Sequence, residues 1–195
     1  MNIKENRTKL FELYAQFEDA TRPHLADAVC KPGCADCCTT VGDVDATTLE
    51  GMVILGHVQT LPSSVQKDFH KKLKQNRKVK SELIYARCAF LLANNTCGIY
   101  AARPFSCRRL YSLKPCGETG PTVNRKVWEL SEETVAAIHG LDSTGYSGHI
   151  SFILQLLNDS VFRKTYLTGG FSPDDIRELA RKHRIVINRF AGVPG

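Results

Sequence analysis

Residues 30–38 read Cys-Lys-Pro-Gly-Cys-Ala-Asp-Cys-Cys and place four cysteines within nine positions. The chain of 195 residues holds eight cysteines, and the other four follow at Cys88, Cys97, Cys107 and Cys116. Thiolates at such short spacing can converge on one soft metal ion or one iron–sulfur cluster, and few other arrangements need them so close. We therefore predict that this part of the chain binds a metal and that the metal organises the fold around it.

The spacing of the first four cysteines leaves the type of centre open. Cys34 and Cys37 form a C-x2-C pair, a spacing that places two sulfurs on one metal. Cys37 and Cys38 are neighbours, and neighbouring side chains of an extended backbone point apart. Both reach one site only through a turn; otherwise they serve two metals or opposite sides of a larger cluster. Two zinc sites would use all eight thiols, whereas one 4Fe–4S cluster would use four and leave the rest for a second cluster, a redox pair or core packing.

All eight cysteines are candidate ligands, and sulfur ligation suits both zinc and an iron–sulfur cluster. Six are the strongest candidates: Cys34, Cys37, Cys38, Cys88, Cys97 and Cys107. Cys30 and Cys116 come next. The alternative is a disulfide framework, but residues 1–21 lack the apolar core of a signal peptide and no run approaches a membrane span. We expect a cytoplasmic protein with no membrane partner, in a compartment where disulfides are rare.

Helical patterns cover most of the chain. Apolar residues recur at helical spacing in residues 10–17, 65–73 and 150–157. Thr47 with Glu50 and Ser63 with Gln66 have capping-box spacing ahead of apolar runs, and Ser131 is placed to cap a further helix. We predict a mainly α fold, in which a helical domain surrounds an irregular cysteine-rich metal-binding core. Residues 1–116 would form the cysteine-cluster region with N-terminal helices, and residues 117–195 a helical C-terminal part packed on the same domain.

The predicted helix after Pro62 is strongly basic, and the formal net charge of the chain is +6. Its exposed charges form either an ordinary solvated face or an electrostatic surface for nucleic acid, an acidic protein or an anionic cofactor. No aromatic platform is interleaved with them, so nucleic acid is not specifically indicated. The candidate partner surface consists of Lys67, Lys71, Lys74, Arg77 and Lys78.

Three arginines, Arg103, Arg108 and Arg109, bracket Cys107. Arginines beside thiolates lower the thiol pKa and offset the charge of a cluster. They can also hold a carboxylate or phosphate through paired hydrogen bonds. The alternative is ordinary surface charge near a turn.

The cysteine motifs resemble the CxxCxxCC (YkgJ-type) cysteine-cluster family, whose members are described as zinc- or iron-chelating. The resemblance spans residues 30–116 and is carried by Cys34-x-x-Cys37-Cys38, by Cys88-x-Phe-Leu and by Cys97-x-Ile-Tyr-x-x-Arg103-Pro104-x-x-Cys107-Arg108. The chain departs from the family pattern at two places. Cys30 and Cys34 are separated by three residues instead of two, and Ala89 stands where the family commonly has proline.

The resemblance leaves activity open. The family includes flagellin lysine N-methylases, and this implies an iron–sulfur cluster and methyl transfer from S-adenosylmethionine. Cys30, Cys34 and Cys37 also have the spacing of the cluster motif in radical S-adenosylmethionine enzymes, but the chain is too short and too helical for their β/α barrel.

Three functional hypotheses follow, each with an unknown protein or small-molecule partner. The first is an iron–sulfur or zinc protein that supports redox or S-adenosylmethionine-dependent protein modification. The second is a zinc-stabilised scaffold whose basic helix contacts an acidic partner, and the third is metal storage or delivery. No P-loop, GxGxxG, HExxH or GxSxG motif occurs, and the six histidines are scattered.

Overall fold

Helices form most of the described chain, which comprises residues 3–31, 33–41, 44–83, 85–117, 120–171 and 173–191 of a computed structural model. The predicted mainly α fold is confirmed, with one small sheet in addition. The α-helices are α1 (Ile3–Thr21), α2 (Thr48–Gln59), α3 (Ser63–Glu82), α4 (Phe105–Arg108), α5 (Arg125–Leu141), α6 (Ile150–Asn158), α7 (Ser160–Leu167) and α8 (Arg177–His183). The shorter helical turns are η1 (Arg22–His24), η2 (Cys37–Val41), η3 (Tyr100–Ala102), η4 (Asp174–Ile176) and η5 (Asn188–Phe190).

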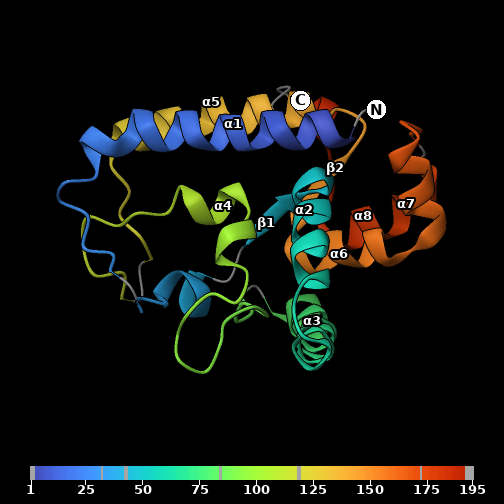
Figure 1. The fold of residues 1–195 in the computed structure, drawn as a ribbon, viewed down its shortest axis with the longest axis horizontal. Helices are drawn as coiled ribbons and strands as arrows, with labels where there is room; N and C mark the ends of the chain where they lie inside the picture. The colour runs from blue at the N-terminus through green and yellow to red at the C-terminus, as the bar shows by residue number, and fades with distance from the viewer. Residues whose placement is uncertain are drawn as a thin grey trace.

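The two long helices α1 and α5 lie side by side along one edge of the molecule (Figure 1). Leu10, Tyr14 and Phe17 form the buried stripe of α1, as their helical spacing predicted. They pack in one apolar cluster with Val127 and Ile138 of α5. The structure therefore packs α5 against α1, while the division of the chain near residue 116 stays a prediction.

The sheet joins three short antiparallel strands in the order β1 (Asp45–Thr47), β2 (Tyr146–His149) and β3 (Val186–Ile187). The central strand β2 is buried along its whole length. β1 leads directly into α2 and β2 directly into α6, so the sheet brings the starts of these two helices together. Strands of two to four residues are too short to show the alternation by which a sequence predicts a strand.

The buried carboxylate of Glu50 joins three helices. The predicted capping box is present, since Thr47 accepts a hydrogen bond from the Glu50 amide and donates its own amide to Glu50 Oε2 at 2.7 Å. Glu50 Oε1 also accepts from the Tyr14 hydroxyl and from the Phe105 amide, both at 2.7 Å. The carboxylate thus fixes α4, which carries Cys107, against α1 and α2.

The helix predicted after Pro62 is present as α3, but two other predicted helix caps were wrong. Ser63 does not cap α3, because Pro62 occupies the N-cap position and no side chain caps the helix. Gln66 instead donates back to the Leu61 carbonyl at 2.7 Å. Ser131 lies inside α5, which begins after Asn124. Among the described helices, none has the length and the apolar character needed to cross a bilayer.

Candidate metal centre

The adjacent cysteines Cys37 and Cys38 lie on η2, a single π-helical turn. The turn is held by the amides of Cys38 and Thr39, which both donate to the Ala35 carbonyl. Successive side chains diverge far less around a helical turn than along a strand, so both thiols face the same side. Their sulfurs are 4.0 Å apart. Two thiolates on one tetrahedral zinc stand about 3.8 Å apart, given a Zn–S bond of about 2.3 Å, so this separation fits two ligands of one metal.

The loop after α3 brings Cys88 and Cys97 to the same place. The Cys88 amide donates to the Cys38 carbonyl at 2.8 Å, and Cys88 raises the pKa of the Cys38 thiol. Cys97 pairs with Leu91 in an isolated antiparallel bridge, next to a Gly98 amide that donates to the Phe90 carbonyl. A backbone hydrogen bond therefore ties Cys88 to η2, and the bridge holds Cys97 on the same loop.

Cys107 comes from α4 and completes what we call the central thiol group: Cys37, Cys38, Cys88, Cys97 and Cys107. Burial raises the pKa of the Cys107 thiol, and the negative charges of Cys37, Cys38 and Cys97 raise it further. The thiol hydrogen bond with Cys38 and burial raise the pKa of Cys37. For Cys38, the largest single influence, its bond with Cys37, lowers the pKa, but Cys88 and burial outweigh it and raise the pKa to about 12.

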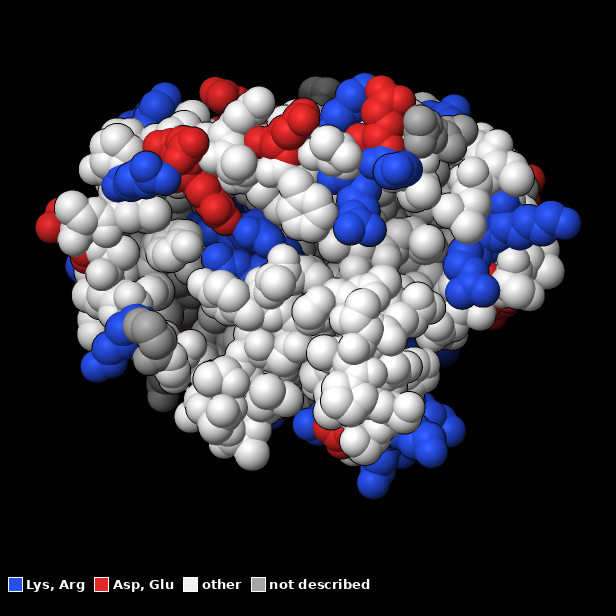
Figure 2. Space-filling view, viewed as in Figure 1, with Lys and Arg blue, Asp and Glu red and all other residues white. Residues whose placement is uncertain are grey.

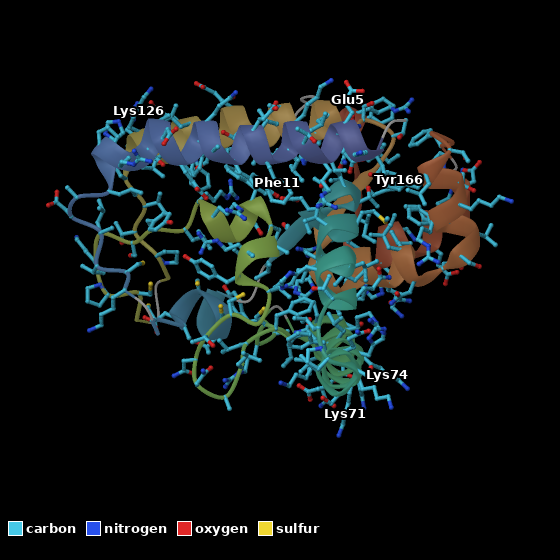
Figure 3. All side chains as sticks on the ribbon, in the orientation of Figure 1. Glu5, Phe11, Lys71, Lys74, Lys126 and Tyr166 are labelled. Atoms are coloured by element: carbon cyan, nitrogen blue, oxygen red, sulfur yellow. The ribbon has the colours of Figure 1, made fainter. Side chains whose placement is uncertain are left out.

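These shifts have one physical meaning for the central thiol group. Apart from the hydrogen bond by which Cys37 favours the Cys38 thiolate, the charges of neighbouring thiolates and burial oppose ionisation, because thiolates repel one another in a partly desolvated space. A bound cation would reverse this, since metal binding stabilises the thiolate form and releases protons. Sulfur atoms, drawn in yellow in Figure 3, gather around η2 and the neighbouring loops.

The remaining cysteines form a second, outlying thiol group: Cys30, Cys34 and Cys116. The Ser112 amide donates to Cys30 Sγ at 3.3 Å. Burial raises the pKa of the Cys116 thiol, and Asp36, Cys30 and Cys34 raise it further. Cys34 is exposed, although the sequence ranked it among the strongest ligands. The ligand role of these three cysteines stays a prediction.

The donor chemistry of the central thiol group fits zinc or iron. Both metals take sulfur ligands, and four thiolates complete a zinc site or a 4Fe–4S cluster. Across the part of the chain that the structure describes, no three histidine, cysteine or acidic side chains are already spaced to hold a metal ion. Metal binding would therefore require the five thiols to draw closer together.

Arg103 is the bracketing arginine that lies beside a thiol. Its positive charge lowers the pKa of Cys97, but burial is the larger influence and the net shift is upward. Its guanidinium carbon lies 4.1 Å from the ring centre of Tyr100. The arginine is thus placed to offset part of the charge that metal-bound thiolates would carry.

Arg108 and Arg109 bind carboxylates of the long helices instead. Arg108 Nη1 pairs with Glu18 of α1 at 2.8 Å, and Arg109 Nη1 pairs with Glu132 of α5 at 3.0 Å. Arg108 is buried and also donates to the carbonyl oxygens of Ala101 and Arg103. These contacts anchor α4 to the long helices α1 and α5. A role of either arginine in anion binding stays a prediction.

The predicted partner surface lies along α3, apart from the thiols. Lys67, Lys71, Lys74 and Lys78 are exposed, whereas Arg77 is half-buried and burial lowers its pKa. Lys71 and Lys74 point outward from the end of the molecule that α3 forms (Figure 3). Figure 2 shows a dense basic group at the same place.

Sequence reasoning missed the two groups that position the cysteines. The capping-box spacing identified Glu50, but only as a helix cap and not as the anchor of α4. No local pattern pointed to Ser112, whose amide meets Cys30 from a distant part of the chain.

Comparison with known proteins places these residues in one domain. Residues 29–124 match the family model CxxCxxCC, whose description is "Putative zinc- or iron-chelating domain". Both thiol groups, the three arginines and α3 fall within this span. No curated protein and no solved structure matches the chain.

Proposed function

Because residues 29–124 make this chain a member of the CxxCxxCC family of zinc- or iron-chelating domains, we propose that the central thiol group is its metal centre. The observation that carries the proposal is the convergence of five thiols from three separate segments on η2. The 4.0 Å separation of Cys37 and Cys38 adds a geometric reason, since it is close to that of two ligands on one metal.

The centre would join three parts of the chain that are far apart in sequence. Cys37 and Cys38 lie on one turn, Cys88 and Cys97 on a loop, and Cys107 on α4. A metal bound to all three segments contributes its binding free energy to folding. Zinc would make the centre a scaffold. An iron–sulfur cluster would add redox chemistry, or S-adenosylmethionine-dependent modification of a protein lysine as the family resemblance implies.

The direct test is metal and acid-labile sulfide analysis of protein purified without oxygen, from cells supplied with both zinc and iron. We expect at least one bound metal per chain. Iron with an equal amount of sulfide and broad visible absorption would identify an iron–sulfur cluster, whereas colourless protein with zinc would identify a scaffold. Protein that holds neither metal, before or after anaerobic reconstitution, would contradict the proposal.

The basic surface of α3 supports a second function, contact with an acidic partner. Its exposed lysines lie along a helix whose buried side is already used by Phe69 and Leu73 in the core. Lys72 of this helix pairs with Asp68 at 2.7 Å. The exposed cations Lys67, Lys71, Lys74 and Lys78 face solvent, where they can meet a polyanionic surface.

We expect the Lys71→Glu/Lys74→Glu variant to leave a heparin column at clearly lower salt than the wild type, because each lost cationic contact weakens polyanion binding. The control is Lys126→Glu/Lys164→Glu, which changes the net charge equally at exposed positions outside α3. Equal elution of the two double variants would show that α3 has no special role. Metal content should be unchanged in both.

A further inference from the structure

A cavity of about 560 Å³ lies beside the sheet, where α4, α5, α8 and the end of α3 meet. Ser147 and His149 of β2 line it, together with Phe105 and Ser106 of α4. No cysteine lines it, although Ser106 is the direct neighbour of Cys107. The helix α4 therefore separates this cavity from the central thiol group.

Three histidines that are scattered in the sequence line the cavity together: His139 of α5, His149 of β2 and His183 of α8. Burial lowers the pKa of His139 and of His183, which favours the neutral form of both. His183 stacks on Phe152 with ring centres 3.8 Å apart. His149 Nδ1 lies 2.8 Å from the Ser151 hydroxyl. The cavity thus presents three imidazoles that neighbouring side chains contact, and burial favours the neutral form of His139 and His183.

A buried relay fixes the tautomer of His139. Asn188 Nδ2 donates to Asp142, both to its carbonyl and to Oδ2, so the Asn188 side-chain oxygen faces Ser147 as an acceptor. The Ser147 hydroxyl donates to that oxygen at 2.5 Å. Because the Ser147 hydroxyl has already given its proton to Asn188, its oxygen must accept the hydrogen bond from His139 Nε2–H, 3.2 Å away. In a neutral ring, this leaves His139 Nδ1 as a hydrogen-bond acceptor.

Basic residues from several elements stand around the cavity. The lining cations are Lys80, Arg109, Lys182 and Arg184, and the lining acids are Asp45, Glu50 and Glu82. Glu50 is buried and already accepts three hydrogen bonds, so it adds no charge that a ligand would meet freely. Within the described residues, Lys182 and Arg184 are exposed and have no carboxylate within ion-pair distance. Two cations at one end of a cavity favour an anionic ligand.

We propose that this cavity binds a small organic acid or phosphate compound. Lys182 and Arg184 meet its anionic group, and His139 Nδ1 accepts a hydrogen bond from a donor group of the same ligand. A volume of several hundred Å³ is that of a small-molecule site, in which a few polar groups fix the orientation of the ligand. The proposal does not rest on the metal centre, because every group it uses lies on the other side of α4.

Isothermal titration of the metal-loaded wild type with inorganic phosphate and with succinate tests the site. We expect saturable binding of at least one probe, and roughly tenfold weaker binding in Lys182→Ala/Arg184→Ala, since a charge-assisted hydrogen bond contributes enough for such a change. His139→Gln, which keeps a donor toward Ser147 but removes the Nδ1 acceptor, should weaken phosphate binding, through loss of the bond from the phosphate O–H, less than the double variant does. It should leave succinate binding unchanged, because ionised succinate has no donor.

The matched control is Lys71→Ala/Lys74→Ala, which removes two exposed cations outside the cavity and should bind the probe as the wild type does. Metal content and circular dichroism of each variant show that it is folded. Absence of binding of both probes to the wild type would overturn the proposal. Equal affinity of the wild type and the Lys182→Ala/Arg184→Ala variant would also overturn it.

Discussion

The Cys37→Ser/Cys38→Ser variant should hold less than about one-tenth of the metal of the wild type, a loss at least as large as that from removing an outer partner of a metal ligand. The change leaves three thiols in the central thiol group, and sulfur-ligated zinc and iron–sulfur centres use four. A serine hydroxyl does not replace a thiolate toward a soft metal. Each single variant keeps four thiols, enough for one centre, so we expect it to lose less metal than the double variant and to bind the remainder more weakly. Elemental analysis after gel filtration measures the result.

The matched control removes two thiols from the outlying thiol group instead. Cys30→Ser/Cys34→Ser leaves all five central thiols in place, and we expect it to keep the metal bound by that group. If the Cys37→Ser/Cys38→Ser variant keeps the wild-type stoichiometry, these residues are not ligands. If the control variant loses as much metal as the Cys37→Ser/Cys38→Ser variant, the division into two groups is wrong.

Replacement of Asp142 by alanine should lower the free energy of unfolding by about 3 to 5 kcal/mol, because it leaves buried donors without an acceptor. Asp142 is completely buried. Its carboxylate accepts from the Tyr166 hydroxyl at 2.7 Å, from the Leu49 amide at 2.9 Å and from Thr48 Oγ1 at 3.0 Å. It also accepts from Asn188 at 3.0 Å, so one side chain joins the starts of α2 and η5 to α7.

Chemical denaturation at pH 7 in the presence of metal measures this loss. The control Asp19→Ala removes an exposed carboxylate whose ion pair with Arg22 is solvated, and we expect it to cost less than about 1 kcal/mol. Similar unfolding free energies for the two variants would contradict the assigned role of Asp142.

The pH dependence of the unfolding free energies of the wild type and of Asp142→Ala supplies an independent check. Burial raises the pKa of Asp142 to about 6, although hydrogen bonds from Tyr166, Leu49 and Thr48 lower it. The folded pKa lies above the unfolded value of about 3.9, so the folded state binds the proton more tightly. The part of the stability that is linked to protonation of Asp142 is therefore fully present below about pH 4 and is lost as the pH rises through about 6, while the hydrogen bonds to the carboxylate remain at pH 7. The gap between wild type and Asp142→Ala should widen as the pH falls from 7 to 5.

The capping-box spacing predicted a helix cap correctly only where no adjacent residue took the cap position. Thr47 and Glu50 form the capping box that their spacing indicates, because both partners belong to one turn. Ser63 and Gln66 have the same spacing, but Pro62 takes the cap position and Gln66 reaches back to the Leu61 carbonyl. The sheet escaped prediction because its pairs, such as Asp45 with His149, are distant in the sequence.

Part of the candidate metal centre was likewise predictable from the sequence, and part was not. The cysteines themselves were evident from composition and spacing, and so was the need for a turn at Cys37 and Cys38. Their separation into two groups was not, because it depends on where α4 lies. That position follows from the hydrogen bond between Glu50 and the Phe105 amide, which spans 55 residues of sequence.

The anchoring of α4 by Glu50 also has a kinetic consequence. Cys107 lies on α4, which is held in place by the buried carboxylate of Glu50 and by the ion pairs of Arg108 and Arg109. Cys37 and Cys38 instead lie on η2, a single turn whose Cys38 carbonyl accepts a hydrogen bond from the Cys88 amide. Segments with few buried contacts open at lower free energy than the core of a domain. Metal uptake and release would then depend on movement of this turn relative to the fixed α4 rather than on unfolding of the helices.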